Sequence, residues 1–62
     1  MDPVTTICHG TRREWSDRAE AIAFFREGAL ACDGSERSRY LDILMGLYCG
    51  LSLCIDGEPL HR

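Results

Sequence analysis

The residues of this chain that could do covalent or metal chemistry are few and poorly spaced for it. Its 62 residues include four cysteines and two histidines, but no CxxC or HxxxH pair. Cys49 and Cys54 are five residues apart, which on a helix separates them by about 140°, whereas a chelating pair is three or four apart. Cys8 and His9 are adjacent, and neighbours in a strand point to opposite faces, so we do not expect a nucleophile and its base there. The sequence predicts no catalytic residue, no metal site and no cofactor.

The chain also has little interior in which to build a pocket. A domain of this size buries only about 60% of the surface that its unfolded chain exposes. Such chains usually depend on disulfides, a metal or a second subunit. The stretch MDPVTTICHG has neither the basic nor the apolar region of a secretory signal, so we expect reduced thiols and a cytoplasmic location in a bacterial cell. The sequence therefore predicts a protein that is not an enzyme and that forms a homodimer or higher oligomer.

All seven basic residues are arginines, and three of them lie close together in the N-terminal third. Arginine binds phosphates and carboxylates through paired hydrogen bonds, so this cluster is the best candidate for contact with a partner or a ligand. Acidic residues interleave with it one for one, and the net charge of -3 argues against a general nucleic-acid binder. With the nearby aromatic residues, the predicted partner-binding set is Arg12, Arg13, Trp15, Arg18 and Phe24.

Residues 4–15 have the pattern of a β-hairpin. β-branched residues fill the first half, and a His-Gly pair can form a tight two-residue turn. The register that follows pairs Cys8 with Thr11, Thr6 with Arg13, and Val4 with Trp15. Alternation then directs Trp15 toward the side that helices cover, and Arg12 and Glu14 toward the other side.

Two helices are predicted after the hairpin. The first spans 17–32 and ends where Gly34 can take a left-handed cap, and the second spans 36–55 with Ser35 as its N-cap. Residues 57–62 are predicted to be a flexible tail. The main apolar row of the second helix recurs at helical spacing and is predicted to be core: Tyr40, Leu44, Leu47, Tyr48, Leu51 and Ile55.

The stretch ILMGLYCGLSLCI, at 43–55, contains no charged residue. A membrane span needs about 20 apolar residues, so this segment is too short to cross a membrane. The face opposite the core row is apolar too, and its G-x-x-x-G spacing allows another backbone to approach closely. Either the first helix or the hairpin covers this face, or it mediates self-association. The predicted oligomer interface is Met45, Gly46, Cys49, Gly50 and Leu53.

The segment GTRREWSDRAEAIAFF at 10–25, followed by GSERSRY at 34–40, resembles small proteins encoded by mobile elements of gut Firmicutes. Those proteins carry the pattern G-x-x-R-E-W-S-x-R-x-E-A and then G-S-E-R-x-R-Y. The resemblance implies a context, because prophages and conjugative elements encode many small proteins that bind host or defence proteins, including inhibitors of CRISPR nucleases. It does not imply an enzymatic activity.

Together these features predict an α+β fold of order ββαα in one domain, residues 1–62. The predicted function is that of a non-enzymatic protein-binding module from a mobile element, an anti-CRISPR-like inhibitor that occludes its target. The alternative is an oligomer whose arginines converge at a subunit boundary to bind a nucleotide or nucleic acid. A purely structural subunit of a larger complex is a third hypothesis.

Overall fold

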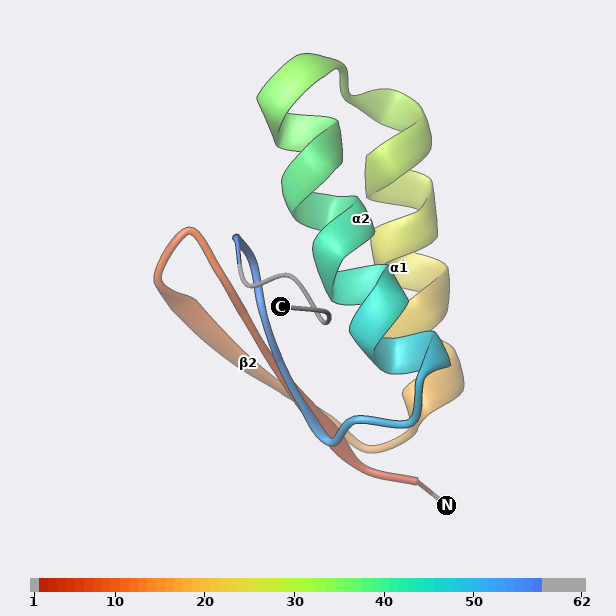
Figure 1. Ribbon diagram of the computed structural model, residues 1–62. Helices are drawn as coiled ribbons and strands as arrows, with labels where there is room; N and C mark the ends of the chain where they lie inside the picture. Colours follow the sequence, from red (N-terminus) through yellow and green to blue (C-terminus); the bar gives the residue numbers. More distant parts are fainter. Residues whose placement is uncertain (1, 58–62) are drawn as a thin grey trace.

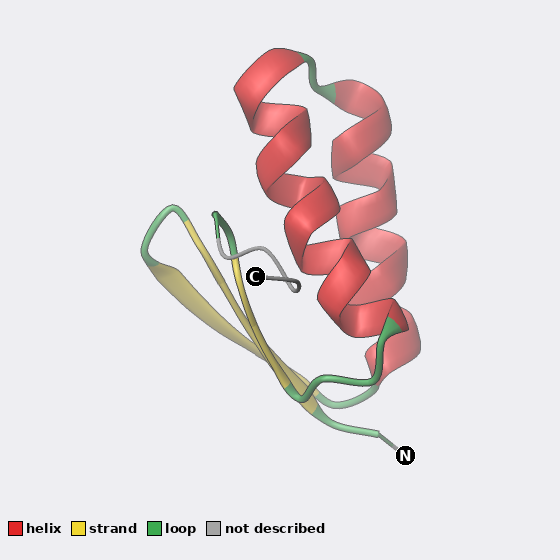
Figure 2. Ribbon diagram, in the orientation of Figure 1, coloured by secondary structure: helices red, strands yellow, loops and turns green. Residues whose placement is uncertain are grey.

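The computed structural model describes residues 2–57, which form a three-stranded sheet with two helices packed side by side on one of its faces (Figures 1 and 2). The strands lie in the order β2-β1-β3, with β1 antiparallel to β2 and parallel to β3. The α+β class is confirmed, with one strand more than the predicted ββαα order. The elements are β1 (Val4–Cys8), β2 (Thr11–Trp15), α1 (Arg18–Ala31), α2 (Gly34–Tyr48) and β3 (Leu53–Ile55).

The hairpin has the predicted turn and register. His9 and Gly10 both have positive φ, 55° and 77°, as a two-residue turn of type I′ requires. Cys8 pairs with Thr11, and the pairing continues in register to Val4 opposite Trp15. Alternate side chains of the hairpin therefore face the helices.

The first helix lies within one residue of its predicted bounds at each end. Asp17 is its N-cap residue, although its side chain makes no capping hydrogen bond. One face carries Ala21, Phe25 and Ala29, all buried against the rest of the core. Small residues at 21 and 29 allow α2 to approach α1 closely, and Tyr40 of α2 packs over Gly28.

The second helix begins two residues before its predicted start at 36, with Asp33 and not Ser35 as its N-cap, and ends seven residues before its predicted end at 55, so both bounds are wrong. The amide of Gly50 donates to the carbonyl of Leu47 at 3.2 Å, and the amide of Leu51 donates to that of Gly46 at 3.0 Å. With Gly50 at φ 93°, this pair of bonds is a Schellman motif, which closes a helix at a left-handed glycine. Gly50 is therefore a helix stop and not part of a helix face.

The chain then returns as β3, a strand that the sequence analysis did not predict. Its residues pair with β1 in parallel, with Cys54 opposite Thr6. Cys54 is buried, and a Cβ on Gly46 would lie only 2.9 Å from its sulfur. The close approach predicted at Gly46 thus exists, but the element that approaches is the chain's own third strand.

The core lies between the sheet and the two helices. The predicted core row is correct for Leu44 and Leu47, but Tyr48 is 65% exposed and Leu51 is 41% exposed. Leu51 lies beyond the early end of α2, whereas Tyr48 is still in the helix but lies on its exposed face with Leu41 and Met45. The predicted tail at 57–62 lies, apart from Gly57, outside the described residues. The buried apolar residues are Val4, Ala21, Phe25, Ala29, Ile43, Leu44, Leu47 and Cys54.

Candidate functional site

Three of the predicted partner-binding residues meet on one side of the molecule. The guanidinium carbon of Arg13 lies 4.2 Å from the centroid of the Trp15 ring and 4.7 Å from that of Phe24. Both distances are within the range of cation–π attraction. We call these three residues the Arg13 cluster.

The sheet and α1 together position this cluster. Arg13 and Trp15 are two apart on β2, so both side chains point toward the helices. The indole Nε1 of Trp15 donates to Thr6 Oγ1 at 3.0 Å, which fixes the ring against β1. Phe24 packs edge-on against the buried Phe25, with ring centroids 5.1 Å apart, yet remains 43% exposed. The cluster is therefore held in place from beneath while its outer side stays open.

Within residues 2–57, no carboxylate forms an ion pair with Arg13. Its guanidinium N–H groups are thus free of carboxylate partners in this part of the chain. A guanidinium that stacks on aromatic rings keeps its planar donors directed outward, where they can bind a carboxylate.

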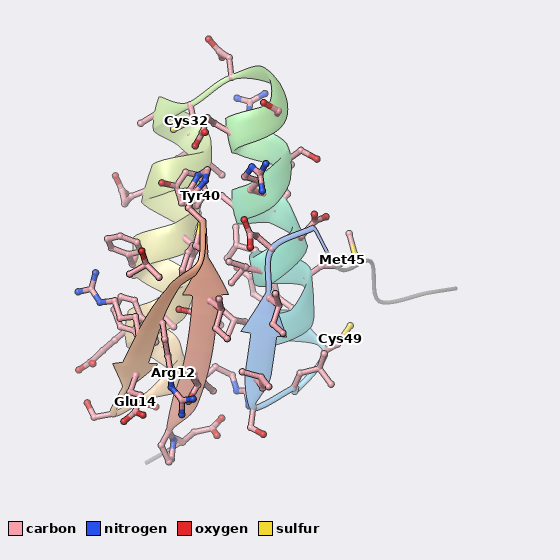
Figure 3. The ribbon with its side chains drawn as sticks, turned by 90° about the vertical axis from the view of Figure 1, so that its left-hand side faces the viewer. Arg12, Glu14, Cys32, Tyr40, Met45 and Cys49 are labelled. Carbon is pink, nitrogen blue, oxygen red and sulfur yellow. The ribbon has the colours of Figure 1, made fainter. Side chains whose placement is uncertain are left out.

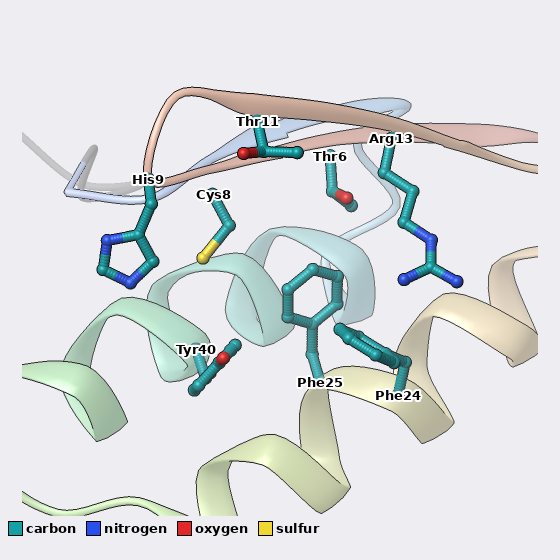
Figure 4. A pocket seen from close by; sticks show the side chains of 8 residues that line it. All are labelled: Thr6, Cys8, His9, Thr11, Arg13, Phe24, Phe25 and Tyr40. Atoms are coloured by element: carbon teal, nitrogen blue, oxygen red, sulfur yellow. The ribbon is translucent and has the colours of Figure 1, made fainter.

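A cleft of about 220 Å³ opens beside the cluster, between the sheet and the helices (Figure 4). Arg13 and Phe24 stand at one end of it and His9 at the other. The walls are mostly apolar and aromatic. The lining residues are Thr6, Cys8, His9, Thr11, Arg13, Phe24, Phe25 and Tyr40.

Cys8 and His9 both line this cleft, contrary to the prediction that they point apart. His9 belongs to the turn, with φ 55°, so strand alternation does not apply to it. Its Nε2 lies 3.0 Å from Glu36 Oε1, and its amide donates to Asp56 Oδ2 at 3.1 Å. Burial raises the pKa of the Cys8 thiol, and the nearby acidic groups raise it further. This is the opposite of what an activated nucleophile needs.

Arg18 serves the fold instead of a partner. Its Nη1 donates to the carbonyls of Leu47 and Leu51, both at 2.8 Å, and its Nη2 donates to that of Gly50 at 3.3 Å. The guanidinium also forms an ion pair with Asp2. It therefore caps the C-terminus of α2, where carbonyls lack helical partners and the helix dipole favours a cation.

Arg12 lies on the other face of the sheet from Arg13. Its Nη2 pairs with Glu14 at 3.2 Å, and both side chains project from the outer face (Figure 3). They line a shallow hollow there with Leu53. Within one chain, the three predicted arginines Arg12, Arg13 and Arg18 thus have three separate environments and do not converge.

The predicted oligomer interface is not formed as one helix face. Gly46 is buried against β3 and Gly50 lies in the turn, while Met45 and Cys49 are exposed near the end of α2 and Leu53 is exposed on β3 (Figure 3). The exposed apolar row on α2 is instead Leu41, Met45 and Tyr48, at helical spacing. Self-association itself stays a prediction.

No protein-family model matches the chain, and neither a curated protein nor a solved structure is significantly similar to it. Within the part of the chain that the structure describes, neither helix has the length and hydropathy that crossing a membrane requires. In the same residues, no three His, Cys, Asp or Glu side chains gather as metal ligands. The description of the site therefore depends on the geometry of the Arg13 cluster and its cleft.

Proposed function

We propose that this chain is a non-enzymatic protein-binding module whose main contact surface is the Arg13 cluster. The observation that supports this most strongly is the stacking of the Arg13 guanidinium on two partly exposed aromatic rings, beside an open apolar cleft. Arg and Trp are the residue types most often found at the energetic centres of protein interfaces. Because stacking restricts these side chains before binding, less conformational entropy is lost when a partner binds.

The resemblance to mobile-element proteins supports a more specific form of this proposal. In that form the chain is an inhibitor of a bacterial defence system, anti-CRISPR-like, that works in the host cytoplasm by covering a functional surface of its target. Such an inhibitor needs exposed contact area more than a deep pocket. The Arg13 cluster offers a charged centre and an aromatic rim of this kind.

The direct test is capture of a partner from bacterial lysate with charge-reversal variants. The tagged wild-type chain should retain one protein in stoichiometric amount, and Arg13→Glu and Phe24→Glu should each reduce its retention at least tenfold. Arg26→Glu is the matched control, since Arg26 is exposed on α1 away from the cluster, and it should retain the partner. Circular dichroism of every variant verifies that the fold is intact.

Two results would contradict this function. Equal retention by Arg13→Glu and the wild type would remove the cluster from the interface. A retained passenger that absorbs at 260 nm and disappears on nuclease treatment or at 200 mM salt would favour the alternative, a nucleotide or nucleic-acid binder.

A further inference from the structure

The strand β2 lies at an edge of the sheet. Within the described part of the chain it pairs only with β1, and four of its five residues are exposed. On the other side of β1, the amide of Thr5 donates to Ser52 O at 2.8 Å, and the carbonyl of Ile7 accepts from the Asp56 amide at 3.0 Å. The backbone groups of Thr5 and Ile7 therefore point toward β3.

This orientation determines where the backbone of β2 points. The antiparallel partners of Thr5 and Ile7 are Glu14 and Arg12. In such a ladder the two residues of a pair either bond to each other or both point away. The N–H and C=O groups of Arg12 and Glu14 therefore point outward along this edge, where an added strand would find four backbone partners.

The cleft lies directly beneath this edge. The inward side chains of β2, Thr11 and Arg13, line the cleft that Phe24 borders on α1 (Figure 4). An extended segment beside β2 would direct every second side chain toward the helices. One such side chain would meet the Arg13 guanidinium, which has no carboxylate partner among residues 2–57 and can therefore bind one. The next, two residues along, would enter the apolar part of the cleft.

A second copy of the chain does not satisfy this edge. Two β2 strands related by a two-fold axis pair antiparallel, and the axis passes through one residue and its symmetry mate. The registers that pair at least three residues of β2 centre on Arg12, Arg13 or Glu14. Centring on Arg12 or Glu14 puts identical charges directly opposite each other, which is destabilising. Centring on Arg13 pairs Arg12 with Glu14 of the other copy, but it also puts the two Arg13 side chains opposite each other, so neither receives a carboxylate. No register of a second copy supplies the carboxylate that Arg13 lacks among the described residues, and the occupant therefore has a different sequence.

We propose that β2 accepts an extended segment of a partner protein as a fourth strand, with an acidic residue opposite Arg13 and an apolar residue two positions away in the cleft. This proposal rests on the protein-binding function and specifies its partner. Main-chain hydrogen bonds to Arg12 and Glu14 would supply affinity, and the two inward side chains would supply specificity.

The test uses a labelled peptide, acetyl-Thr-Phe-Thr-Glu-Thr-Phe-Thr-amide, and pools in which its threonine and phenylalanine positions are varied. The pattern is symmetric, so it fits either strand direction. Wild-type chain should bind the Glu peptides at least tenfold more tightly than their Lys counterparts. Arg13→Glu should reverse this preference, and Arg26→Glu should not change it. Because a reversal requires a folded site, loss of folding cannot imitate it.

Two further measurements distinguish strand addition from a simple anion site. N-methylation of alternate peptide amides should weaken binding at least tenfold, and bound peptide should slow hydrogen exchange at the Arg12 and Glu14 amides. If phenylacetate competes at equal concentration, or if N-methylated peptides bind unchanged, the cleft holds a free acid and strand addition is wrong. No acid-dependent binding up to millimolar peptide would also overturn it.

The capture experiment separates the two proposals. If Arg13→Glu loses the captured protein but no peptide binds, the protein-binding function stands and the added strand does not. If Arg13→Glu keeps the captured protein, the function falls and the inference falls with it.

Discussion

The two edges of the sheet differ in how their polar groups are used. At the β3 edge, the three carbonyls at the end of α2 bond to Arg18, and the buried carboxylate of Asp56 pairs with Arg39 at 2.9 Å. At the β2 edge, the described residues leave Arg13 without a carboxylate. Among these residues both outer strands pair with β1 alone, so the edges differ in their side-chain contacts and not in their free backbone groups. We call the β3 edge closed, because the polar side chains beside it bond within the chain, and the β2 edge open, because Arg13 can bind the carboxylate of a partner.

Two arginines five residues apart illustrate this difference. Arg18 is bonded to backbone atoms of a distant turn, whereas Arg13 stacks on rings at the surface. Residue type alone does not distinguish them, since each is next to an acidic residue in the same charged segment, Arg13 before Glu14 and Arg18 after Asp17. They differ in what lies opposite each side chain. The turn at the end of α2 brings backbone carbonyls to Arg18, whereas Arg13 lies opposite aromatic rings. The predictions below test the comparison, beginning with the largest expected effect.

The adjacent residues Phe24 and Phe25 should contribute very differently to stability. Phe25→Ala removes a fully buried ring and should cost about 3–5 kcal/mol, enough to unfold most of a domain this small. Phe24→Ala should cost only about 1 kcal/mol, because its ring is partly exposed already. Urea unfolding followed by circular dichroism measures both. Similar losses for the two variants would mean that Phe24 belongs to the core and not to a contact surface.

Because Gly46 and Cys54 are in contact, substitutions at the two positions should be strongly coupled in their effects on the free energy of unfolding. In Gly46→Ala the new methyl would lie 2.9 Å from the Cys54 sulfur, so despite a gain in helix propensity of about 1 kcal/mol we expect a net loss of about 1–2 kcal/mol. In the double variant with Cys54→Ala the sulfur is gone, and most of that loss should be recovered. A double-mutant cycle of unfolding free energies measures the coupling. Additive effects would contradict the packing of β3 on α2.

Asp56 should make the closed edge sensitive to acid. Burial opposes ionisation of this carboxyl group, but hydrogen bonds from the His9 amide and Arg39 outweigh burial and lower its pKa below the ordinary 3.8. A folded-state pKa below the unfolded value stabilises the fold above pH 3.8, and this stabilisation is lost as pH falls through the lowered pKa.

Asp56→Asn should therefore cost about 1–2 kcal/mol at pH 7 and flatten the loss of stability between pH 4 and pH 2. Urea unfolding across that range measures it, with the exposed Glu27→Gln as control. If the stability of Asp56→Asn fell between pH 4 and pH 2 as steeply as that of the wild type, the Asp56 carboxylate would not stabilise the β3 edge.

The alkylation rates of the thiols test the same difference between the two edges without any substitution. Cys49 is exposed, Cys8 lies half-buried in the open cleft, and Cys54 of β3 is buried against α2 with its pKa raised by burial. Iodoacetamide at pH 8 should therefore label Cys49 fastest and Cys54 slowest, by at least tenfold, with Cys8 between them. Peptide mapping by mass spectrometry gives the rates. If Cys54 reacted as fast as Cys49, the β3 edge would be open in solution.

Local patterns predicted the hairpin and α1 well, because their signals lie within a few residues. A His-Gly turn sets the register of β1 and β2, and alternation then places Arg13 and Trp15 on one face. The meeting of Arg13, Trp15 and Phe24 could be anticipated for the same reason, since the last strand residue and the start of α1 are close in sequence.

The end of α2 was mispredicted because two readings of Gly50 compete. At helical spacing from Gly46 it resembles a packing motif, yet a glycine followed by the alternating stretch Leu51 to Ile55 also signals a helix stop and a strand. The parallel pairing of β3 with β1 decides between them, and this contact joins residues almost fifty positions apart. The role of Arg18 could not be foreseen either, because it depends on that same turn.

The most direct test of the contrast between the edges is thermal unfolding of Arg18→Ala and Arg13→Ala side by side. Loss of three backbone contacts at the end of α2 should lower the Tm of Arg18→Ala by roughly 10 °C, whereas Arg13→Ala should lose about 5 °C or less. If Arg13→Ala were destabilised as much as Arg18→Ala, Arg13 would be a structural residue and the β2 edge would not be a surface kept free for a partner.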